Sequence, residues 1–97
     1  MTDAQILASV KMALPITTNA YDDEINELIE SAMLDLTTAG VEMPATVDGL
    51  VLTAIKTYCR MHFGAPANYD QLKASYDEQK AQLGMRTGYT RWTRTAQ

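Results

Sequence analysis

The 97-residue sequence lacks most of the features that indicate a particular chemistry. Its single cysteine, Cys59, excludes a disulfide within the chain and is typical of a protein made in a reducing cytoplasm. Its single histidine, His62, cannot supply a histidine cluster for zinc. No apolar run reaches the roughly 18–20 residues that a membrane span requires, and no basic amphiphilic leader is present. We therefore expect a protein without metal, signal peptide or membrane partner.

Catalytic motifs are absent as well. The sequence contains no G-x-S-x-G, no glycine-rich phosphate loop and no set of cysteine, histidine and aspartate that could act together. Its many carboxylates fall on an amphipathic helix, where solvation is the usual explanation. Cys59 lies in an apolar segment, which favours a small buried hydrophobe over a reactive thiol. The sequence predicts neither an enzyme nor a bound cofactor.

Charge divides the chain into two parts. Residues 1–83 carry all twelve acidic residues and five basic ones, a balance of −7. Residues 84–97 carry three arginines and no acid, a balance of +3. We therefore divide the chain into a helical domain, residues 1–83, and a basic aromatic C-terminal arm, residues 84–97. The asymmetry indicates different partners for the two parts.

The most apolar stretch, residues 47–63, is predicted to be a central helix. Apolar residues recur there at spacings of three and four on more than one side, so the helix should be covered on most sides. The predicted core positions are Leu50, Val51, Ala54, Ile55, Tyr58 and Phe63. A narrow polar strip is expected from Thr53, Lys56, Thr57 and Arg60.

Three further helices are predicted around it. The first covers residues 2–14, with Thr2 and Gln5 as a capping box and Pro15 after its end. The second covers residues 22–38 and is followed by Gly40, a natural C-terminal cap. The fourth runs from about residue 69 to residue 83 with a thin apolar stripe, so it either docks through an aromatic edge or is covered by another subunit. The predicted fold is all-α, a small bundle of about four helices with an extended C-terminal arm.

Two surfaces are candidates for binding. The outer face of the second helix is acidic, and it is either solvated or a contact for a basic partner; its residues are Asp23, Glu27, Glu30 and Asp35. The arm combines arginine with aromatic residues, which are enriched at protein–protein hot spots and also stack on nucleic acid. We favour a protein interface for the arm; its residues are Arg86, Tyr89, Arg91, Trp92 and Arg94.

A helix-turn-helix arrangement does not fit the second and third helices. The link between them is longer than the usual tight turn, and the helix in the recognition position is apolar with few side chains to read bases. The acidic second helix would also be repelled by phosphate.

The order and spacing of these segments resemble a known family. YDDEINELIESAMLDL, a proline-containing link, GLVLTAIKTYCRMHFG and a polar helix starting at Tyr69 resemble the head–tail connector (adaptor) proteins of tailed bacteriophages. Residues 22–36 and 50–63 carry the match, which extends over roughly residues 1–83. The arm does not resemble any sequence that we can name.

The resemblance implies a structural virion protein at the neck, the head–tail interface. It implies an oligomeric ring of about a dozen copies between the portal protein and a tail or stopper protein, with DNA passing through the channel without sequence-specific binding. On this view the acidic face lines the channel or meets a neighbouring subunit. The alternative is a small cytoplasmic interaction or regulatory module whose arm binds nucleic acid or a partner protein. Salt-sensitive DNA binding by a monomer or dimer would distinguish it.

Overall fold

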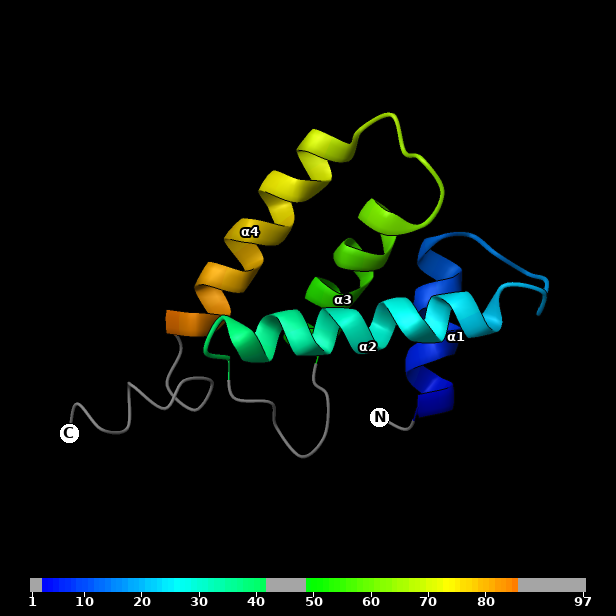
Figure 1. Ribbon diagram of the computed structural model, residues 1–97, viewed down its shortest axis with the longest axis horizontal. Helices are drawn as coiled ribbons and strands as arrows, with labels where there is room; N and C mark the ends of the chain where they lie inside the picture. Colours follow the sequence, from blue (N-terminus) through cyan, green and yellow to red (C-terminus); the bar gives the residue numbers. More distant parts are fainter. Residues whose placement is uncertain (1–2, 42–48, 86–97) are drawn as a thin grey trace.

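The computed structural model describes residues 3–41 and 49–85. That part of the chain contains four helices and no strand, so the predicted all-α bundle is confirmed (Figure 1). The helices are α1 (Asp3–Ala13), α2 (Asp22–Thr38), α3 (Gly49–His62) and α4 (Tyr69–Met85). The predicted bounds of the second helix are confirmed. α4 continues for two residues into the predicted arm, whose remaining residues, 86–97, lie outside the described part, as does Thr2 of the predicted capping box.

α3 is the centre of the bundle. It packs against each of the other three helices, with α1 and α4 on opposite sides of it and α2 crossing it (Figure 1). Half of its residues are buried, and they cover several of its sides: Val51, Leu52, Ala54, Ile55, Thr57, Cys59 and Met61. Full burial of an aliphatic side chain such as Ile55 contributes about 1.5–3 kcal/mol. The predicted central helix therefore supplies much of the hydrophobic core.

The predicted composition of α3 needs two corrections. Leu50 was placed in the core but is 48% exposed, because it lines a hollow between the start of α3 and the end of α4. Thr57 was placed on the polar strip but is buried, with its hydroxyl donating to the Thr53 carbonyl at 3.0 Å. This bond removes the penalty of an unpaired buried hydroxyl, so threonine is tolerated inside. Tyr58 and Phe63 are partly buried against the core.

α2 begins with three acidic residues and ends in a glycine-dependent cap. Gly40 has φ +96°, and the Val41 amide donates to the Leu36 carbonyl while the Gly40 amide donates to the Thr37 carbonyl, both at 3.0 Å. These two bonds form a Schellman motif, which needs a left-handed residue at Gly40. Val41 and Leu36 are both buried, so the cap also contributes to the core. The prediction of Gly40 as the C-terminal cap is confirmed.

α1 and α4 cover the flanks of the central helix. Ile6 and Val10 bury one face of α1, and Lys11 ties its end to the next helix through Asp22, at 2.8 Å. α4 buries only three side chains, Leu72, Tyr76 and Leu83, in agreement with its thin predicted stripe. The aromatic edge of α4 does dock within the chain, since the Tyr76 and Tyr58 rings lie 5.4 Å apart.

Candidate functional site

The outward face of α2 carries three exposed carboxylates. Asp23, Glu27 and Glu30 lie at spacings of four and three, opposite the buried residues of the helix, and none forms an ion pair with any residue in the described ranges. Leu34 follows Glu30 by one turn and is 68% exposed. We call Asp23, Glu27, Glu30 and Leu34 the acidic face. This face therefore combines three carboxylates with one exposed apolar side chain.

The sequence analysis did not single out Leu34. Leu34 lies outside the apolar stripe of its helix. Because it follows Glu30 by four residues, the sequence could have placed it on the same face as the carboxylates.

Asp35 does not belong with the other three carboxylates. Its Oδ2 accepts a hydrogen bond from the Tyr76 hydroxyl at 2.5 Å and lies 3.2 Å from Lys80 Nζ. The hydrogen bond from Tyr76 is the main reason that the pKa of Asp35 is lowered, and the Lys80 ammonium adds to it. The predicted set of four therefore separates into an outward group of three and one residue that ties α2 to α4.

The surroundings of Tyr76 favour a protonated hydroxyl that donates to the Asp35 carboxylate. Its side chain is 3% exposed, and Lys80 Nζ lies 5.1 Å from the centre of its aromatic ring. Burial and the Asp35 carboxylate raise the pKa of Tyr76, so the phenol keeps its proton. The group of Asp35, Tyr76 and Lys80 is a structural connection between helices.

Basic side chains are mostly paired within the fold. Of the five in the described ranges, Lys11, Lys73 and Lys80 form ion pairs with Asp22, Asp77 and Asp35. The remaining two, Lys56 and Arg60, form no ion pair with any described residue and lie four residues apart on one side of α3. We call these two residues the basic strip. They leave positive charge unneutralised on a body that is otherwise acidic.

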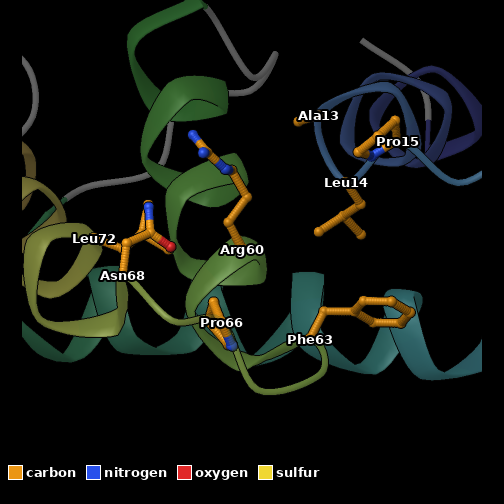
Figure 2. Close-up of a pocket in the computed structure, with 8 residues that line it drawn as sticks. All are labelled: Ala13, Leu14, Pro15, Arg60, Phe63, Pro66, Asn68 and Leu72. Carbon is orange, nitrogen blue, oxygen red and sulfur yellow. The ribbon is translucent and has the colours of Figure 1, made fainter.

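A groove of about 240 Å³ lies beside Arg60. Figure 2 shows the Arg60 side chain extending between the end of α1 and the start of α4. The groove is lined by Ala13, Leu14, Pro15, Arg60, Phe63, Pro66, Asn68 and Leu72. Six of its eight lining residues are apolar, and Arg60 and Asn68 add a guanidinium and an amide, so both apolar and polar atoms line it. This composition suits an apolar side chain that has a carboxylate as its neighbour.

A second hollow, of about 200 Å³, lies between the start of α3 and the end of α4. It is lined by Leu50, Thr53, Gln79, Gln82 and Leu83. The exposed Leu50 is at this site, and Gln79 Oε1 is buried without a hydrogen-bond partner among the described residues. Gln79 occupies the position where the stripe of α4 calls for an apolar residue. The hollow therefore leaves Leu50 and Gln79 without close packing between α3 and α4.

Two residues of α3, Cys59 and His62, carry side chains that can take part in chemistry. Cys59 is fully buried, as predicted, and burial raises the pKa of its thiol to about 12. The His62 aromatic ring lies 4.4 Å from that of Tyr58 and 6.3 Å from that of Tyr69. Within residues 3–41 and 49–85, no three potential ligands are grouped to hold a metal ion. No helix in those ranges is both long and apolar enough to cross a membrane.

The predicted binding residues of the arm lie outside the described part of the chain. These are Arg86, Tyr89, Arg91, Trp92 and Arg94. Their assignment to a subunit or portal interface stays a prediction. The surfaces that the structure does describe are the acidic face, the basic strip and the groove.

The comparison with known protein families decides the family. A family model described as "Phage connector protein" matches residues 6–90, which is most of the chain. The chain belongs to this family. The resemblance to phage connector proteins is confirmed, and the family is a structural one at the neck of the virion. Comparisons with curated proteins and with solved structures gave no significant match.

Proposed function

We propose that this protein forms an oligomeric ring at the phage neck, where it joins the portal protein to a tail or stopper protein. The observation that carries the proposal is the family match over residues 6–90, which includes all four helices of the body. Packaged DNA would pass through the centre of the ring without sequence-specific binding. The role is structural, with no catalytic step and no cofactor.

The charge distribution supports assembly. The acidic face on α2 and the basic strip on α3 carry opposite charges, and neither forms an ion pair with a residue in the described ranges. A ring forms by heterologous contacts, in which one surface of each subunit meets a different surface of the next. Opposite charges on two such surfaces favour that association and disfavour contacts between like surfaces.

The C-terminal arm is the proposed contact with the portal or with a neighbouring subunit. Its arginines with Tyr89 and Trp92 are the residue types that dominate protein interfaces. Its positive charge complements an acidic body. The arm and the helical body therefore have separate roles in this proposal, one reaching a partner and the other forming the ring.

The test is the solution mass, measured by light scattering coupled to size exclusion, for the protein alone and with the portal protein. A mass of about a dozen subunits in either condition supports the proposal. A monomer or dimer that does not bind the portal but binds DNA at low salt overturns it. That outcome supports a regulatory module that binds nucleic acid through its arm.

A further inference from the structure

We propose that the acidic face of one copy binds the basic strip and groove of the next copy, so that Glu27 meets Lys56, Glu30 meets Arg60 and Leu34 enters the groove. This inference rests on the proposed function, because it specifies how neighbouring subunits of the ring contact one another. Each of its two surfaces is made of described residues.

The two surfaces match in spacing. On α2, Glu30 follows Glu27 by three residues and Leu34 follows by seven. On α3, Arg60 follows Lys56 by four residues and Phe63 follows Lys56 by seven. Phe63 still follows the helical path, because its amide donates to the Cys59 carbonyl at 2.9 Å. Seven residues correspond to two helical turns, or about 10.5 Å. Two helices that run parallel therefore bring both carboxylates against both cations in one register.

The same register places the exposed leucine at the groove. Leu34 stands one turn beyond Glu30, and the apolar walls formed by Leu14, Phe63 and Pro66 stand beside and beyond Arg60 (Figure 2). The volume of about 240 Å³ exceeds the roughly 150 Å³ of an engineered cavity that holds a benzene molecule, so one leucine side chain fits. Burial of Leu34 would supply affinity, while the charge pairs fix the register.

The two surfaces also face different sides of the subunit. The groove contains no residue of α2, and the acidic face lies on the side of α2 opposite its buried residues. One subunit therefore cannot close the contact on itself. Each subunit keeps one acidic face and one basic strip free for two different neighbours, which is the requirement for a closed ring.

Charge reversal tests the pairing. The variant E27K/E30K reverses the acidic face, and K56E/R60E reverses the basic strip. We expect each variant alone to lose assembly, with at least a tenfold rise in the concentration for half-assembly, because like charges then oppose each other. An equimolar mixture should regain assembly, since both kinds of contact between the two variants have opposite charges. The readout is the solution mass, alone and with portal protein.

The control is D70K/E78K, which makes the same charge change at two exposed residues of α4. It should assemble like the wild type, and circular dichroism should show that every variant is helical. Assembly of E27K/E30K at wild-type concentrations overturns this inference and leaves the ring intact. So does a mixture that stays dissociated. If the wild type itself neither self-associates nor assembles on portal, the proposed function has failed and the pairing with it.

Discussion

The hydroxyl of Tyr76 donates a hydrogen bond to the carboxylate of Asp35 across 2.5 Å, and the two residues are 41 positions apart in the sequence. The bond connects α4 to α2, while the Tyr76 aromatic ring rests on that of Tyr58 in α3. One side chain therefore links three helices. The link adds to the packing of Leu72 and Leu83, the other two buried side chains of α4.

Replacing Tyr76 with phenylalanine should destabilise the fold by about 1 kcal/mol. The substitution keeps the aromatic packing and removes the hydrogen bond to the Asp35 carboxylate. Because this charged acceptor is partly exposed, water reduces the contribution of the bond to stability. Urea unfolding followed by circular dichroism measures the change. The matched control is Tyr69→Phe, because the Tyr69 hydroxyl has no hydrogen bond to a described residue. Equal effects of the two substitutions would contradict the structural role of the bond.

The same pair predicts a loss of stability in acid. The pKa of Asp35 is lowered below the ordinary value of 3.8, chiefly by Tyr76, so the unfolded chain binds a proton more readily than the folded one. The stabilisation is therefore fully present above about pH 4 and is lost as the pH falls through the folded pKa. Urea unfolding over a pH series should show this loss in the wild type and a smaller loss in Tyr76→Phe. An equal loss of stability in acid for the two proteins would show that the Tyr76 hydrogen bond does not contribute to it.

The sequence was sufficient for the elements of this fold because each helix carries a local signal. The bounds of α2 were predicted correctly from three local features. These are its acidic first turn, its apolar stripe and the glycine at position 40. The apolar content of residues 47–63 likewise identified the central helix. The spacing of apolar residues shows which residues share a face of a helix, and this spacing can be read from a short segment of sequence.

The assignment of individual surfaces required contacts between helices. Asp35 looked like part of the acidic face because it lies on the same helix as the other three carboxylates. In the structure its carboxylate instead binds Tyr76 and Lys80 of α4 and so connects α2 to α4. Leu50 looked like core because it is apolar, but it lines the hollow between α3 and α4 and is 48% exposed. The i, i+4 pair of Lys73 and Asp77 could be predicted from the sequence and is confirmed. The pairs of Lys11 with Asp22 and of Lys80 with Asp35 could not, because each joins two helices.

The different burial of Ile55 and Leu50 gives a direct test of the core. Ile55→Ala should reduce the free energy of unfolding by about 2–5 kcal/mol, because Ile55 is fully buried and truncation leaves a cavity. Leu50→Ala should cost about 1 kcal/mol or less, since its side chain is already half in contact with water. Urea denaturation of both variants measures the difference. A loss at Leu50 as large as at Ile55 would show that Leu50 is buried in solution, for instance by a neighbouring subunit.

The thiol of Cys59 should be unreactive in the folded protein. Burial removes access and raises the thiol pKa to about 12, so almost no thiolate exists at pH 8. We expect a disulfide reagent to label native protein far more slowly than protein in denaturing urea. The labelling rate in water should rise in Ile55→Ala, because a less stable fold opens more often. Rapid labelling of the native wild type would place Cys59 at the surface.

Deletion of residues 86–97 separates the arm from the body. The helices and buried residues described above all precede residue 86, so the truncated chain should keep its helical circular dichroism and a cooperative unfolding transition. If the arm contacts the portal, the truncated protein should lose binding to portal protein in a pull-down. Substituting Arg91 and Trp92 by alanine in the full chain should weaken the same binding, since these residue types dominate interfaces. Full portal binding by the truncated chain would assign that contact to the helical body and leave the positive charge of the arm without a role in assembly.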